Sequence, residues 1–97
     1  MLEAFTLSTF ADRLGDTFVV GEGSDALETR LVEAASLGPA SGEDGRPFSL
    51  VFVGPLDPIL PQQIYRFEHE ALDSFELFIV PIGPDESDGM QYEAVFS

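Results

Sequence analysis

Apolar and polar residues alternate with a period of two over most of the second half of the chain. The stretches 48–53, 64–68 and 91–96 each carry aromatic or aliphatic residues at every second position. Successive side chains of a strand point to opposite faces of a sheet, so this period predicts three strands, each with an apolar face. The core residues expected in this half are Phe48, Leu50, Phe52, Tyr65, Phe67, Leu77, Phe78, Val80, Tyr92 and Phe96.

The segment ELFIVPI, residues 76–82, lacks this alternation because it is apolar at nearly every position. A continuous apolar run of this length is typical of a strand that is covered on both faces. We therefore expect other parts of the protein to pack on both sides of this strand.

The first half of the chain predicts a short helix followed by a β-hairpin. Ser8 is a candidate N-cap, apolar residues recur after it at helical spacing, and Gly15 stands where a helix should end. Phe18 and Val20 then share one face of a strand, and alternation resumes over 27–31 after a glycine-rich turn. Six strands and one helix are expected in total.

This succession of short strands predicts a mainly β fold, either an antiparallel β sandwich or a partly open barrel with one short N-terminal helix. The chain has 97 residues, which suits one core, so residues 1–97 are expected to form a single domain. The polar segment GPASGEDGRP is interpreted as a loop within this domain.

The segment 55–61 contains three prolines, whose lack of an N–H donor keeps it out of a central strand. It must therefore run along an edge of the sheet or across an end. Its apolar residues Leu56, Ile59 and Leu60 allow two interpretations. They form a lip that receives a partner protein, or they plug one end of the core, as short apolar loop segments commonly do.

The charge of the chain restricts its partners. Eighteen acidic residues stand against four arginines, and the formal net charge is −14. Such a chain repels phosphate backbones and anionic membrane surfaces, so neither nucleic acid nor membrane is an expected partner. The chain has no cysteine and shows neither a signal peptide nor an apolar run long enough to span a bilayer, so we expect a soluble protein, cytoplasmic by default.

Few residues are available for catalysis. His69 is the one imidazole, it lies between two glutamates at a strand end, and we expect it to be solvated or on an edge strand. No G-x-S-x-G elbow presents a serine nucleophile. Glu68 and Glu76 are candidates to face each other across a hairpin, yet a carboxylate pair also needs a cleft that separates their pKa values. We expect no catalytic site.

The turn PDESDG is the one candidate for metal binding. Asp85, Glu86 and Asp88 precede a glycine, as in a fragment of a calcium loop. The order of the ligands and the distal glutamate of such a loop are missing, so a solvated acidic turn is the preferred interpretation. We expect no metal and no cofactor.

Three stretches together resemble a known family: TLSTFADRLGDTF, PFSLVFVGPLDPILPQQIYRFEHEAL and ELFIVPIGPDESDGMQYEAVF. They cover nearly the whole chain and are similar to DUF6916, a bacterial domain family of unknown function. The resemblance implies no activity, but it suggests an association with tail-collar or phage-tail-like fibre proteins. We therefore expect a non-catalytic accessory or interaction protein, a structural component or assembly chaperone for such a fibre. The alternative is a small ligand-binding protein or hydrolase that uses the proline-rich lip.

Overall fold

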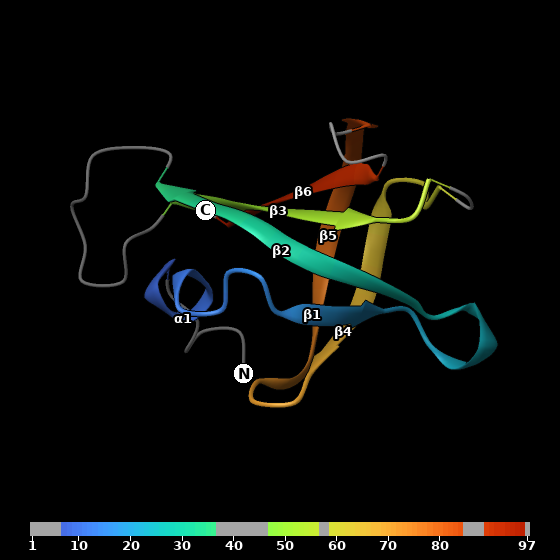
Figure 1. Ribbon diagram of the computed structural model, residues 1–97, viewed down its shortest axis with the longest axis horizontal. Helices are drawn as coiled ribbons and strands as arrows, with labels where there is room; N and C mark the ends of the chain where they lie inside the picture. Colours follow the sequence, from blue (N-terminus) through green and yellow to red (C-terminus); the bar gives the residue numbers. More distant parts are fainter. Residues whose placement is uncertain (1–6, 37–46, 57–58, 85–88, 97) are drawn as a thin grey trace.

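The residues that the structure describes form a closed, six-stranded antiparallel barrel with one short α-helix (Figure 1). The computed structural model describes residues 7–36, 47–56, 59–84 and 89–96. Their elements are α1 (Leu7–Ala11), β1 (Thr17–Val20), the 3-10 helix η2 (Gly23–Asp25), β2 (Leu27–Ser36), β3 (Phe48–Gly54), β4 (Gln63–His69), β5 (Asp73–Pro84) and β6 (Met90–Phe96). The expected mainly β fold is confirmed, as a barrel that closes fully.

The strands follow the order β1-β2-β3-β6-β5-β4 around the barrel. In Figure 1, β1, β2 and β3 cross the front of the molecule, while β4 and β5 run behind them at a steep angle. The register shifts in β2 between Leu31 and Glu33 and in β5 between Pro81 and Gly83. Such bulges bend a strand, which helps the sheet to curve into a barrel.

Pairing of β1 with β4 closes the barrel. Val19 lies opposite Glu68, and Val20 lies opposite Phe67. Because every described strand has a neighbour on each side, none is an edge strand.

The helix contributes one large side chain to the core. Phe10 is fully buried, and its ring centroid lies within 6.4 Å of four other phenylalanine rings, those of Phe18, Phe48, Phe75 and Phe96. The helix begins at Leu7 with Ser8 inside it, so Ser8 is not the N-cap. Gly15 ends the following turn with a φ of 90°, a conformation that favours glycine.

The core contains most of the residues that the sequence predicts. Tyr65 and Val80 are half-buried, and the prediction for Phe78 is wrong because half of this residue is exposed. The β5 side chains that face the core are Phe75, Leu77 and Ile79. The expected residues that are buried are Phe48, Leu50, Phe52, Phe67, Leu77, Tyr92 and Phe96.

The expectation that the run 76–82 is covered on both faces is also wrong. Phe78 and Ile82 are 50% and 47% exposed, while their neighbours Leu77 and Ile79 are buried. One apolar face of β5 therefore points into the barrel and the other points outward.

Helices of the described residues are short. None of them has the length and apolar character that a membrane-crossing helix requires.

Candidate functional site

The proline-rich segment leaves the barrel at Gly54, where β3 meets its neighbours closely. A Cβ added there would lie 3.1 Å from the Thr29 Cγ2 and 3.7 Å from the Tyr92 Cε2. Glycine therefore lets the backbone pass close to these side chains before the chain turns away. The next described residues, Pro55 and Leu56, are exposed.

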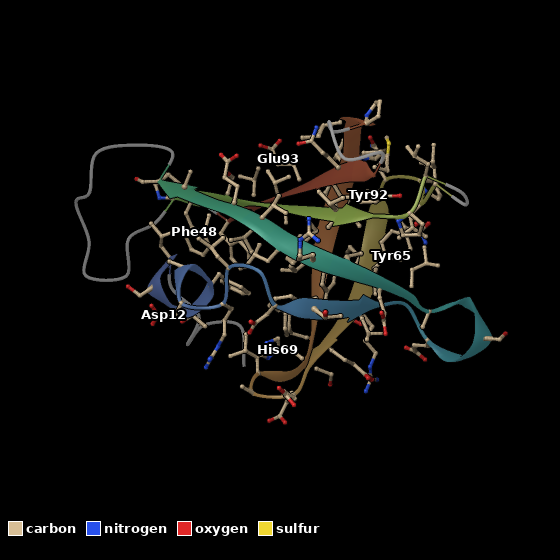
Figure 2. All side chains as sticks on the ribbon, viewed as in Figure 1. Asp12, Phe48, Tyr65, His69, Tyr92 and Glu93 are labelled. Atoms are coloured by element: carbon tan, nitrogen blue, oxygen red, sulfur yellow. The ribbon has the colours of Figure 1, made fainter. Side chains whose placement is uncertain are left out.

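Two tyrosine hydroxyls fasten the far end of this segment. The Leu60 N–H donates to the Tyr92 hydroxyl oxygen at 2.8 Å, and the Tyr65 hydroxyl donates to the Pro61 carbonyl at 2.7 Å. Tyr92 stands on β6 and Tyr65 on β4, and both appear on the right side of the molecule in Figure 2, with Tyr92 above Tyr65. Residues 60 and 61 are thus fixed to two different strands of the barrel.

The pKa of Tyr65 is raised above its ordinary value of 10.0, first by burial and second by the neighbouring Tyr92. Both causes disfavour the phenolate. Tyr65 therefore keeps its proton, and its ability to donate to Pro61, throughout the physiological pH range.

The three predicted contact residues of this segment have different surroundings. Leu60 is half-buried and packs against the core, whereas Leu56 is 41% exposed and Ile59 is 50% exposed. Burial of Leu60 agrees with the interpretation of a plug for the core, whereas reception of a partner by Leu56 and Ile59 stays a prediction. Leu60 anchors it on the core, while Leu56 and Ile59 present apolar surface to solvent. We refer to Leu56, Ile59 and Leu60 as the lip.

A separate, open pocket of about 850 Å³ lies away from the lip. The turn before β1, the strand β1 itself and the hairpin of β4 and β5 form its walls. Its lining is mostly polar and includes His69, which lies at the lower side of the molecule in Figure 2. The lining residues are Gly15, Asp16, Thr17, Val19, Arg66, Glu68, His69, Glu70, Asp73 and Ser74. A ligand in this pocket would not contact the lip.

His69 is held at both ring nitrogens. Its Nδ1 accepts the Ala71 backbone N–H at 3.0 Å, and its Nε2 lies 2.8 Å from the Asp16 carboxylate oxygen. Because the backbone N–H can only donate, Nδ1 carries no proton, so Nε2 carries the proton and donates it to Asp16. Neither nitrogen is free to take a proton from a substrate.

The surroundings of His69 explain this arrangement. Leu72 N–H donates to the His69 carbonyl at 3.2 Å, and Asp73 follows with a φ of 60°, which is typical of a three-residue hairpin loop. His69 is only 8% exposed, and its imidazole fastens this turn and ties it to Asp16, 53 residues away in the sequence. The prediction of a solvated or edge-strand histidine is wrong.

The predicted carboxylate pair does not form. Glu68 lies opposite Ser74 in the hairpin register, and Glu76 lies opposite Arg66. Arg66 contacts Glu68 on its own strand at 3.3 Å, with both side chains well exposed. The hairpin therefore does not bring the two glutamates together as an acid and base.

Metal ligands do not gather in the described parts of the chain. No three histidine or carboxylate side chains there are placed to hold a metal ion together. The acidic turn with Asp85, Glu86 and Asp88 lies outside the described residues.

Fold and site together define a small antiparallel barrel domain with a fastened apolar lip and an internally satisfied histidine. The chain belongs to the family DUF6916, a domain of unknown function, whose model matches residues 5–96. Comparison with curated proteins and with solved structures gives no match.

Sequence reasoning missed the tyrosine hydroxyls that fix the lip. Tyr65 and Tyr92 were expected to serve the core, and their side chains do occupy inward positions of β4 and β6. A usable signal was present, because a tyrosine in an apolar core needs a hydrogen-bond partner for its hydroxyl. The proline-rich segment nearby offers backbone groups that no strand pairing satisfies.

Proposed function

We propose that this chain is a non-catalytic docking domain that binds another protein through the lip. One observation carries the proposal: Leu56 and Ile59 stay 41% and 50% exposed on a segment whose other end is fixed by two tyrosine hydroxyls. Exposed apolar side chains on a fixed backbone are typical of recognition surfaces.

The fixed backbone favours binding because less conformational entropy is lost on association. Prolines restrict the segment in the free protein, and the Tyr92 and Tyr65 hydroxyls hold Leu60 and Pro61 in place. Contacts made by Ile59, directly before these held residues, then contribute to affinity with little further ordering of its backbone.

The non-catalytic part of the proposal is supported by His69. A general base needs an unoccupied nitrogen within reach of its substrate, and both nitrogens of this imidazole already have protein partners. The hydrogen bonds of His69 instead stabilise a hairpin.

The partner we propose is a protein of a larger assembly, with a tail-fibre-like protein as the first to be tested. This choice rests on the family resemblance, while the net charge of −14 supports a protein over nucleic acid or an anionic membrane. The domain would serve as an accessory or structural component of that assembly.

The experiment replaces Leu56 and Ile59 together with serine and follows co-purification of the tagged chain with its partner from the native host. The matched control is Leu14→Ser, because Leu14 is as exposed as Ile59 but lies in the turn after α1. We expect the double variant to keep its far-ultraviolet circular dichroism spectrum and lose the partner, while the control keeps both. A folded double variant that retains its partner would remove the lip from the proposal.

A further inference from the structure

The outer face of β4 and β5 carries a second exposed apolar surface. It consists of Ile64, Phe78, Val80 and Ile82, and we call it the β4–β5 face. Ile64 and Phe78 lie directly opposite each other in the register and are 61% and 50% exposed. Ile82 is 47% exposed, and Val80 is half-buried between it and Phe78 along β5.

This surface differs from the outer faces of the other long strands. The outward positions of β2 include Glu28, Arg30 and Glu33. On β4, the outward residues that follow Ile64 are Arg66 and Glu68. The exposed valines on the outer faces of β2 and β6, Val32 and Val95, stand singly, whereas on β4 and β5 Ile64 lies opposite Phe78 and Val80 and Ile82 follow along the same strand. A strand with two apolar faces normally has both covered, so the β4–β5 face requires a cover that the described elements do not supply.

The known packing of the chain places its other elements elsewhere. The helix α1 packs against β2, and β4 and β5 run behind β2 in Figure 1. The inward side chains of β5, such as Leu77, already fill the core. The described residues therefore leave the outward side of this ribbon open to a partner.

Two glutamates and one arginine border the face, because Arg66 lies opposite Glu76 in the hairpin register. Glu76 precedes Phe78 on the outward side of β5, and Glu93 lies opposite Val80 on β6. Figure 2 shows Glu93 at the upper surface of the barrel. The ion pairs among described residues use Glu68 and Asp16, which leaves the carboxylates of Glu76 and Glu93 outside any such pair.

We infer that the β4–β5 face binds a protein surface with apolar side chains at its centre and lysine or arginine side chains around them. The charge of the chain distinguishes this partner from a second copy, since two copies would each bring a net charge of −14 to the contact. A basic rim would instead pair with Glu76 and Glu93. The inference shares with the proposed function the docking of a protein, but it places a contact on this second surface and adds the chemistry of the partner.

The first step of the test places a photo-crosslinking amino acid at position 78 in the full chain, expressed in the native host. The same amino acid at position 14 is the control, because Leu14 and Phe78 are both 50% exposed. Mass spectrometry then identifies the protein attached to each. The inference expects an adduct at position 78 that is absent at position 14. Equal labelling at the two positions, no adduct at 78, or an adduct with a second copy of the chain would overturn it.

The second step measures the affinity of the purified adduct protein for the chain. Phe78→Ser and Ile64→Ser, which change opposite strands, should each weaken binding by about tenfold or more, while Leu14→Ser leaves it unchanged. Affinity should also fall as salt rises from about 50 mM to about 300 mM, and this dependence should shrink in Glu76→Gln/Glu93→Gln. An affinity that depends on neither salt nor Phe78 and Ile64 contradicts the inference.

The lip variant separates this inference from the proposed function. If Leu56→Ser/Ile59→Ser loses the partner while Phe78→Ser and Ile64→Ser keep it, the lip is the docking site and the β4–β5 face is not. The reverse result supports the β4–β5 face and removes the lip. Circular dichroism of each variant confirms that it is folded, and the two single variants protect the test against misfolding of either one.

Discussion

His69 illustrates how a polar side chain can fasten a turn in a protein this small. Its Nδ1 accepts a backbone N–H two residues later, as the side chain of asparagine or aspartate does in an Asx-turn. Its Nε2–H donates a hydrogen bond to the carboxylate of Asp16, which precedes β1. The ring also packs on Phe18, with centroids 4.6 Å apart. One residue thus joins a hairpin, a neighbouring turn and the core.

The sequence could not predict this role. It showed one histidine between two glutamates at a strand end, and the strand end is correct. Burial of the ring depends on Asp16 and Phe18, which lie about fifty residues earlier and reach His69 through closure of the barrel. A contact of such sequence separation leaves no local pattern.

We expect His69→Ala to lower the free energy of unfolding by about 1–3 kcal/mol, because it removes both hydrogen bonds and leaves the Ala71 N–H without an acceptor. His69→Asn should cost less, since its side-chain oxygen can accept from Ala71 in an Asx-turn while the Asp16 bond is lost. Urea denaturation of the three proteins measures this order. Equal stabilities would contradict the fastening role.

Phe10→Ala should cost about 3–5 kcal/mol, because the ring fills the space between four other phenylalanines. Leu14→Ala, at a half-exposed position a few residues later, should change stability by less than about 0.5 kcal/mol. Both are measured by chemical denaturation. A small effect at Phe10 would show that α1 does not contribute to the core.

At the scale of elements, the sequence predicts one covered face for β3 and two for β5, whereas the structure covers both faces of β3 and one face of β5. β3 alternates in sequence, yet Ser49 and Val51 on its second face are only 4% and 6% exposed. β3 lies between β2 and β6, and Val51 stands between the longer side chains of Glu33 and Glu93 in the register. β5 is continuously apolar, yet its second face is exposed at Phe78.

This difference shows that hydrophobic patterning does not predict whether the outer face of a strand is covered. The period of two correctly predicted the strands and most of the inward residues, because it follows from backbone geometry alone. Coverage of the outer face depends on the neighbouring strands and on other molecules, which the pattern of one segment does not contain. The sequence could not decide between the two interpretations of the lip for the same reason. Burial of Leu60 and exposure of Ile59 depend on where Tyr92 and Tyr65 hold the chain.

The hydrogen bonds that Tyr92 and Tyr65 make with Leu60 and Pro61 should contribute differently to stability. Tyr92→Phe removes the acceptor of a part-buried Leu60 N–H and should cost about 1–2 kcal/mol, whereas Tyr65→Phe removes an exposed bond and should cost about 0.5 kcal/mol or less. Thermal or urea unfolding gives the comparison. Each substitution should also weaken partner binding, since the lip is then less fixed. An unchanged affinity in both variants would argue against preorganisation.

The raised pKa of Tyr65 makes a prediction for alkaline solution. Because its pKa in the folded state lies above the ordinary 10.0, its contribution to stability is present below that value and is lost as pH rises through the folded-state pKa. Stability should therefore fall less steeply in Tyr65→Phe than in the natural chain between about pH 9 and about pH 11. Denaturation at several pH values tests this, and parallel curves would contradict it.

At the scale of the whole molecule, charge opposes the compact state. The net charge of −14 is confined to a body 39 Å in its longest dimension. At about 10 mM salt the screening length is roughly 30 Å, so most of these charges repel one another, while at about 150 mM it falls to roughly 8 Å. The exposed Arg66 and Glu68 pair offers little attraction in return.

The melting temperature should therefore rise by a few degrees when sodium chloride is raised from about 10 mM to about 150 mM. Potassium chloride at the same ionic strength should act alike, because screening does not depend on the identity of the cation. A melting temperature that falls with salt would mean that attractive ion pairs dominate.

Docking through the lip is the central property that we propose for this domain, and hydrogen–deuterium exchange with and without the co-purified partner locates the contact. We expect the partner to slow exchange in peptides that cover residues 59–66, which contain the fastened end of the lip. Exchange around the polar pocket, at residues 69–74, should stay unchanged. Slowed exchange at 69–74 with no change at 59–66 would contradict docking through the lip and assign binding to the pocket.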